Sequence, residues 1–76
     1  MELAKAFGVV IRELRKEAGL TQEQLGLEAD LRRTFVSLLE LGQQQPTLQT
    51  IFKLSVALNK KPSEIMAMVE NLVNTN

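Results

Sequence analysis

The 76-residue sequence contains no cysteine, histidine, tyrosine or tryptophan, and these absences remove several classes of chemistry. Without cysteine the chain cannot form a disulfide or a thiolate metal site. Without histidine it lacks the most frequent general base and metal ligand of enzymes. Its four glycines are scattered and form no phosphate-binding loop. We therefore expect a protein that is not an enzyme, with no metal, no cofactor and no evident small-molecule ligand.

Long apolar runs are also missing from the sequence. No stretch approaches the roughly 18 to 20 consecutive apolar residues that span a bilayer, so no membrane contact is expected. The N-terminal residues 1–5 lack the pattern of a signal peptide. A hydrophobic content of 45% and a charged content of 24% are ordinary for a globular protein. We expect a cytoplasmic protein with a single domain, residues 1–76, built on one modest core.

Helical periodicity runs through the whole sequence, and no segment reads convincingly as a strand. The pattern predicts five helices, over about 2–18, 22–29, 33–41, 48–58 and 63–73. In the first helix the predicted inner stripe consists of Leu3, Phe7, Ile11 and Leu14. In the fourth helix the predicted inner face consists of Leu48, Ile51, Leu54, Ser55 and Leu58. The fold class is therefore all-α, a compact five-helix domain, and its polar end at residues 74–76 is expected to fray.

Capping signals set the expected helix ends. Thr21 can cap the second helix, and Gln24 three residues later completes a capping box. Thr47 and Ser63 can cap the fourth and fifth helices. Gly42 is placed to end the third helix in a left-handed conformation. The second and third helices are short and separated by a tight turn, which is the arrangement of a helix-turn-helix, whose second helix enters the DNA major groove.

The ordered motifs of the chain resemble the Cro/repressor-type helix-turn-helix family, also called the xenobiotic-response-element family of regulators. The similarity covers roughly residues 7–65. The matching pieces are Ile11-Arg12-x-Leu14-Arg15, Gly19-Leu20-Thr21-Gln22, Leu25, Phe35-Val36-Ser37, Leu39-Glu40-x-Gly42, Pro46-Thr47-Leu48, Ile51, Leu54, Ala57-Leu58 and Pro62-Ser63-Glu64-Ile65. The resemblance implies a lambda-repressor-like domain and a sequence-specific regulator of transcription, expected to be a repressor, that binds double-stranded DNA.

The third helix is expected to read base edges in the major groove. Its candidate residues for base readout are Arg32, Arg33, Thr34, Ser37 and Leu38. Arginine can donate two hydrogen bonds to guanine, whereas Leu38 can offer only apolar contact to a thymine methyl group. A solvated, charged helix end is the alternative reading of Arg32 and Arg33.

Other residues are expected to hold the DNA backbone or the fold itself. The expected backbone contacts are Gln22, Arg12, Gln43, Gln44 and Gln45, with backbone N–H groups of the three loop glutamines donating to phosphates. The role of Gln22, at the start of the second helix, is implied by the resemblance; an ordinary polar first-turn residue is its alternative. The resemblance also implies a structural ion pair between Arg15 and Glu40, joining the first helix to the end of the third.

The sequence departs from the pattern of the family in three respects. Arg32 stands where a capping Ser, Thr or Asp is usual, which leaves open a helix start moved back to Asp30. Leu41 replaces a usual Arg or Lys, and three glutamines replace a usually basic loop. The formal net charge is zero, so long-range attraction to DNA is weak.

The fifth helix carries more apolar residues than one side of a small core is expected to use. We therefore expect residues 63–73 to be a dimerisation helix, joined by an unusual valine on the fourth helix. The predicted homodimer interface consists of Val56, Ile65, Met66, Val69, Leu72 and Val73. The alternative is that Met66 and Val73 merely cover one end of the monomer.

A second class of function stays open at the level of sequence. The third helix carries apolar Leu38 and Leu41, which suit the docking of a protein partner. In that case the chain is a protein-interaction module of the antitoxin or anti-repressor type. Salt-dependent retention on DNA separates the two hypotheses.

Overall fold

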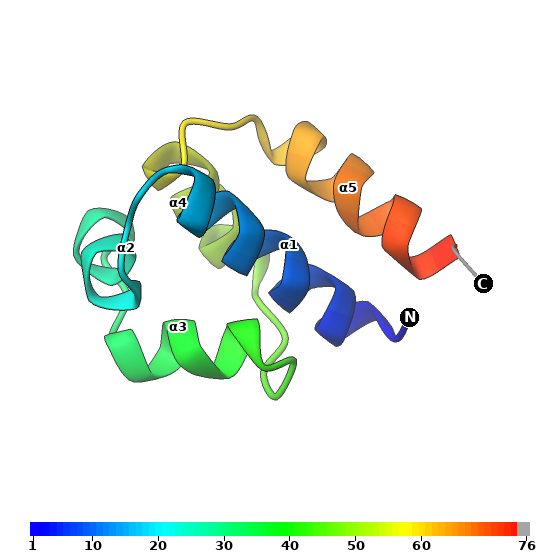
Figure 1. The fold of residues 1–76 in the computed structure, drawn as a ribbon, viewed down its shortest axis with the longest axis horizontal. Helices are drawn as coiled ribbons and strands as arrows, with labels where there is room; N and C mark the ends of the chain where they lie inside the picture. Colours follow the sequence, from blue (N-terminus) through cyan, green and yellow to red (C-terminus); the bar gives the residue numbers. More distant parts are fainter. Residues whose placement is uncertain (75–76) are drawn as a thin grey trace.

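Residues 1–74 are described by a computed structural model and form five α-helices (Figure 1). These are α1 (Leu3–Glu17), α2 (Gln22–Ala29), α3 (Arg33–Glu40), α4 (Leu48–Ala57) and α5 (Pro62–Asn74). No strand occurs among the described residues, and the predicted all-α class is confirmed. Every helix boundary lies within one residue of the predicted one. Asn74 belongs to α5, while the expected fraying of residues 75–76 lies outside the described part of the chain.

The hydrophobic core forms around α1, which crosses the middle of the molecule between α3 and α5 (Figure 1). The side chains that are almost completely buried, all below 2% exposed, come from all five helices. They are Val10, Ile11, Leu25, Val36, Leu39, Leu54, Ile65 and Val69. Gly8 allows α1 to approach the end of α3 closely, since a Cβ atom there would overlap the carbonyl oxygens of Leu39 and Glu40. The core therefore fixes the position of α3 directly.

Two residues assigned to inner faces from the sequence are exposed instead. Leu3 is 55% exposed, and the neighbouring Ala4 is buried. Leu3 lies in the first turn of α1 and lines a shallow apolar depression with Pro46 and Met66. Leu48 is 78% exposed, because it lies about 120° around α4 from the fully buried Leu54. The prediction that Leu3 and Leu48 belong to the core is wrong.

The fifth helix begins earlier than expected and is more deeply buried. Pro62 is its first residue, where the missing proline N–H costs no helical hydrogen bond. Lys61 therefore precedes the helix, and its N–H donates to the Glu64 carboxylate at 2.8 Å. Ser63 lies inside the helix, so the expected cap is displaced by two residues.

The broad apolar stripe of α5 is largely used within the monomer. Ile65 is 0% and Val69 is 1% exposed in the single chain. Leu72 and Val73 are partly buried and also pack against the core. Because Ile65 and Val69 have no exposed side-chain surface, the prediction that they face a second copy is wrong. Their burial follows from the position of α5, which packs against both α1 and α4.

Candidate nucleic-acid interface

Local signals in the sequence set both ends of α2, including the turn that leads to α3. The Gln24 N–H donates to the Thr21 hydroxyl at 3.1 Å, and the Thr21 N–H donates to the Gln24 side chain at 2.8 Å, completing the predicted capping box. At its other end α2 closes at Asp30, whose φ of 57° is left-handed. The Leu31 N–H then donates to the Gly26 carbonyl at 2.8 Å. The contacts at Asp30 and Leu31 set the direction in which the chain leaves α2 toward α3.

Helix α3 starts without a side-chain cap. Arg32 occupies the N-cap position with extended backbone angles, and its side chain accepts no hydrogen bond from the helix. The open alternative of a start at Asp30 is not realised, since Asp30 terminates α2. The first N–H groups of α3 therefore lack the side-chain acceptor that a serine or threonine supplies at this position.

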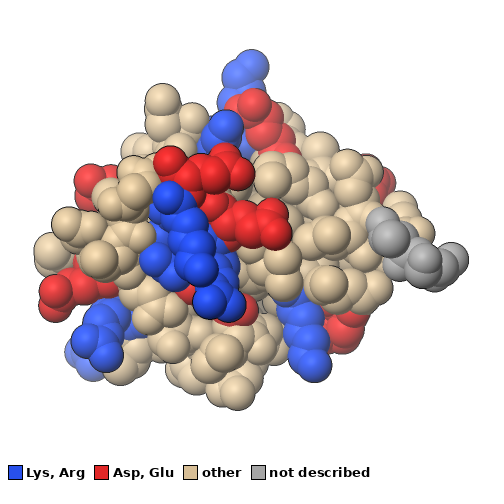
Figure 2. All heavy atoms as spheres, viewed as in Figure 1, with Lys and Arg blue, Asp and Glu red and all other residues tan. Residues whose placement is uncertain are grey.

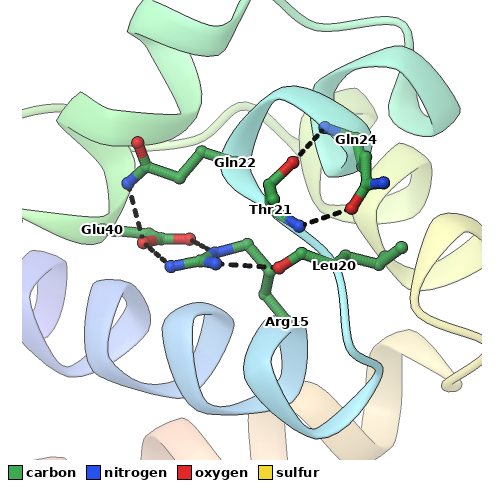
Figure 3. Close-up of polar contacts among 6 residues, drawn as sticks. All are labelled: Arg15, Leu20, Thr21, Gln22, Gln24 and Glu40. Carbon is green, nitrogen blue, oxygen red and sulfur yellow. Dashed lines mark hydrogen bonds and ion pairs between the residues drawn. The ribbon is translucent and has the colours of Figure 1, made fainter.

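A polar network joins α1, α2 and the end of α3 (Figure 3). The expected ion pair is present: the Arg15 guanidinium donates to both Glu40 carboxylate oxygens, from Nε at 2.7 Å and from Nη2 at 3.1 Å. Arg15 Nη1 also donates to the Leu20 carbonyl at 2.9 Å. The two side chains are only 11% and 4% exposed. This pair ties the C-terminal end of α3 to α1.

Gln22 completes this network from α2. Its Nε2 atom donates to Glu40 Oε1 at 3.0 Å (Figure 3). A side-chain amide nitrogen carries two N–H groups, so one remains for an external acceptor such as a phosphate oxygen. Glu40 thus receives donors from two helices, and its negative charge is neutralised by Arg15 beside the outer face of α3.

The outer face of α3 carries the residues predicted for base readout. Arg32, Arg33 and Thr34 are exposed, and Ser37 and Leu38 are partly exposed. Val36 and Leu39 are fully buried, as a helix with one inner face requires. Leu41 is 59% exposed directly after α3 and was not included among the predicted readout residues. The spacing of positions 34, 37, 38 and 41 along one helical face was the signal that could have identified it.

One side of the molecule brings together Gln22 of α2 and three other predicted contact residues, Arg12 of α1 and Arg33 and Ser37 of α3. Arg12, Gln22, Ser37 and Leu41 line one shallow depression with Arg15 and Glu40. Gln22 and Arg33 line a second depression with Thr21 and Glu23. Gln22 is therefore common to both depressions, with Arg12 beside it in the first and Arg33 in the second. These two cations lie next to the outer face of α3, on the side that Gln22 occupies.

The glutamine loop after α3 differs from the expectation in one respect. Gly42 has a φ of 74°, and the Gln43 N–H donates to the Leu38 carbonyl at 2.9 Å. This N–H closes the end of the helix in a Schellman arrangement. The prediction that it donates to a phosphate is therefore wrong for the Gln43 backbone. The side chains of Gln43, Gln44 and Gln45 are exposed and stay candidates for backbone contact.

The charges of the molecule do not form one broad basic area. Figure 2 shows Lys and Arg interleaved with Asp and Glu on one face. Within residues 1–74, a second ion pair at 3.7 Å joins Lys53 to Asp30, which is 95% exposed and so adds little stability. Arg12, Arg32 and Arg33 are exposed cations without a carboxylate within 4.0 Å in the described part of the chain. The electrostatic attraction to DNA therefore comes from single exposed arginines and not from a long-range field of the whole molecule.

The exposed apolar surface lies mainly on α4 rather than on α5. Val56 is 79% exposed, as predicted for an interface residue, and Met66 is 38% exposed. Leu48 and Phe52, at 78% and 58%, lie eight and four residues before Val56 on the same face. We call Leu48, Phe52 and Val56 the α4 stripe. The sequence carried this i, i+4, i+8 spacing, but Leu48 was assigned to the core.

Two other kinds of site are not found in residues 1–74. No helix there is long and apolar enough to cross a membrane. No group of three or more acidic, cysteine or histidine residues in the same range could hold a metal ion.

Comparison with known proteins places this arrangement among regulators. A model of the helix-turn-helix family matches residues 11–65. Control protein C.BamHI of Bacillus amyloliquefaciens is 36% identical over 61 residues, covering 79% of this chain and 75% of the relative. Control protein C.MunI of a Mycoplasma species is 35% identical over 65 residues, covering 84% of this chain and 88% of the relative.

Solved structures give the same picture. The restriction-modification controller protein C.AhdI from Aeromonas hydrophila superposes with a TM-score of 0.80 at 40% identity, over 82% of this chain and 94% of that chain. The clp gene regulator ClgR from C. glutamicum superposes with a TM-score of 0.91 over 100% of this chain and 99% of that chain. Its identity is 18%, so it supports the fold alone.

Proposed function

The chain belongs to the helix-turn-helix family, and from this premise we propose that it is a sequence-specific, duplex-DNA-binding regulator of transcription that acts as a repressor. The observation that carries the proposal is the exposed outer face of α3 with cations next to it. Arg33 and Thr34 are presented to solvent, and Arg12 lies beside Gln22 on the same side. Relatives named as control proteins support a regulatory role.

We propose separate roles for two groups of residues. Arg32, Arg33, Thr34, Ser37 and Leu38 read base edges, because they project from the helix that enters the groove. Arg12, Gln22 and the loop side chains of residues 43–45 hold the backbone and set the register of α3. Arg15 and Glu40 contact each other and not the DNA, since both are nearly buried.

We further propose that the protein acts as a homodimer on an inverted repeat. The α4 stripe and the exposed part of Met66 support this proposal. These apolar side chains are not covered by other parts of the described chain. Small domains gain little stability from one core, so burying this surface against a second copy also stabilises the fold. A two-fold dimer places its recognition helices in half-sites about 34 Å apart, roughly one turn of DNA.

A selection from random duplexes with the purified protein tests the proposed function. We expect an enriched inverted repeat, and Arg33→Ala should relax base preference at one position in each half-site. Gln22→Ala should weaken binding to all sequences alike, which makes it the matched control for a backbone contact. In a reporter with the selected site across the promoter, the protein should lower expression. Recovery of no symmetric motif would contradict the proposal and favour a protein partner for the same face.

A further inference from the structure

The outer face of α3 is chemically divided along its length. Its N-terminal end carries Arg32 and Arg33, whereas its C-terminal end carries Leu38 and Leu41. Along the lower edge of Figure 2, where Figure 1 places α3, uncharged atoms separate the basic groups. An arginine can donate to guanine, but a leucine offers no hydrogen bond to any base edge. The two ends of α3 must therefore recognise different chemical groups.

Leu41 is exposed but held in a fixed position. It is 59% exposed, and its backbone keeps helical angles with φ −81° and ψ −5°. Its N–H donates to the Ser37 carbonyl at 3.0 Å, and the next two N–H groups donate to the Leu39 and Leu38 carbonyls at 3.1 and 2.9 Å. Because the backbone of Leu41 is already fixed, binding through its exposed apolar surface costs little additional conformational entropy.

The position of Leu41 makes it part of the proposed reading surface. Thr34, Ser37, Leu38 and Leu41 fall within about 100° around the helix axis, so they share the outer face. Leu41 also lines a depression with Arg12 and Ser37, next to the proposed backbone contact. An α-helix rises about 1.5 Å per residue, which places Leu41 about 12 Å from Arg33 along the axis. At about 3.4 Å per base, this corresponds to roughly three to four base pairs.

We propose that Leu41, together with Leu38, recognises the C5-methyl group of a pyrimidine in the major groove, about three to four base pairs from the base that Arg33 contacts. This inference rests on the proposed function and specifies part of the site that it recognises. The C5-methyl group is the apolar feature that a base presents in the major groove. Thymine carries it in ordinary DNA, and 5-methylcytosine carries it in modified DNA. The family usually has Arg or Lys at this position, so Leu41 offers an apolar contact where a hydrogen-bond donor is usual.

The test uses the duplex recovered from the random selection, resynthesised with uracil in place of each thymine in turn. Uracil lacks only the methyl group, so a loss of affinity measures that contact. At one position per half-site we expect a loss of about three- to fivefold for each methyl removed. Replacing both symmetric thymines should lower the affinity of the dimer by roughly ten- to twenty-fivefold. Leu41→Ala should bind thymine and uracil duplexes alike at that position.

Further arms separate the sources of the methyl group and control for folding. At the same position, a duplex with 5-methylcytosine is compared with one carrying cytosine. If the duplex with 5-methylcytosine binds more tightly than the one with cytosine, the methyl group by itself is the feature recognised. If methylation has no effect and only the thymine duplex binds more tightly, the protein recognises thymine. Leu27, an exposed leucine on α2 (79%), provides the control Leu27→Ala, which should keep the thymine–uracil difference. Leu41→Ala and wild type should show the same circular dichroism spectrum and melting temperature.

The contrary outcomes are distinct. If wild type binds the selected duplex but uracil at no position changes its affinity, the methyl contact is absent and the proposed function stands. If Leu41→Ala retains the full difference between thymine and uracil, another residue contacts the methyl group, so this inference fails while the proposed function stands. If wild type retains no duplex at all, this inference and the proposed function both fail.

Discussion

Two arginines that lie three residues apart on α1 have different proposed roles because of their surroundings. Arg15 is 11% exposed and paired with Glu40, whereas Arg12 is exposed at the edge of the proposed DNA-binding face. Breaking a buried pair leaves a buried charge without a partner, which costs several kcal/mol. An exposed arginine contributes little to folding. The same residue type therefore stabilises the fold in one case and is proposed to contact DNA in the other.

Arg15→Ala should lower the free energy of unfolding by about 3 kcal/mol, because it leaves the Glu40 carboxylate buried without its cation. Arg12→Ala is the matched control on the same helix. It should change stability by less than about 0.5 kcal/mol and instead weaken binding to all duplexes. Urea unfolding measures the first effect and duplex titration the second. Equal stability losses for the two variants would show that the Arg15–Glu40 pair does not hold α3 to α1.

At the scale of the helices, the sequence predicted the boundaries better than the exposed faces. Boundaries depend on local groups such as Thr21 with Gln24, or Gly42 at the end of α3, which act within a few residues. Exposure depends on which neighbours a helix meets. Helix α5 packs against both α1 and α4, so Ile65 and Val69 are buried within the monomer. Periodicity identifies an apolar face but not whether the same chain or a second copy covers it.

In the proposed site, too, the features set by local sequence were predictable and those set by tertiary packing were not. The Arg15–Glu40 pair and the inward turn of Val36 and Leu39 were predictable, since both follow from the family motif and the helical period. Two other contacts could not be predicted from the sequence. They are the hydrogen bond from Gln22 to Glu40 and the one from the Gln43 N–H to the Leu38 carbonyl. They depend on the angle between α2 and α3 and on the tight end of α3, which only the assembled tertiary structure shows.

The uncapped start of α3 gives a prediction for this helix. Arg32→Ser should place a hydroxyl oxygen where it can accept a helix N–H, and so raise the free energy of unfolding by about 1 kcal/mol. The same change removes a proposed base contact, so affinity for the selected duplex should fall. Arg33→Ser, one residue inside the helix, is the control that loses charge without gaining a cap. Urea unfolding and duplex titration on both variants give the comparison. A variant Arg32→Ser that is no more stable than Arg33→Ser would contradict the capping argument.

For the whole molecule, the α4 stripe predicts how the oligomeric state responds to substitution. Val56→Asp should place an unpaired charge in the proposed interface and convert the dimer to a monomer. Leu27→Asp is a matched control, since both side chains are 79% exposed and Leu27 lies outside the stripe. Sedimentation at roughly tens of micromolar protein, well above the dissociation constant of a stable dimer, measures both. A wild-type protein that sediments as a monomer, or a Leu27→Asp variant that dissociates equally, would remove the basis for this interface.

The charge balance of the molecule predicts a weak dependence of binding on salt. With a net charge of zero, few cations reach the phosphates: Arg12, Arg32 and Arg33 are exposed, while Lys53 is next to Asp30. Each phosphate neutralised contributes about −0.9 to the slope of log affinity against log salt concentration. For a dimer we expect a slope of roughly −3 to −5, compared with about −10 for a strongly basic repressor. A slope near −8 or steeper would mean that further basic residues hold phosphates.

The central claim, that the outer face of α3 reads DNA sequence, is tested most directly by a ratio of two affinities. The selected duplex is compared at one moderate salt concentration with the same duplex whose half-sites are scrambled. Because length and charge are equal, backbone contacts cancel and the ratio reports base readout. The account predicts a preference of about 10³-fold or more for the selected duplex. A ratio close to one would contradict it.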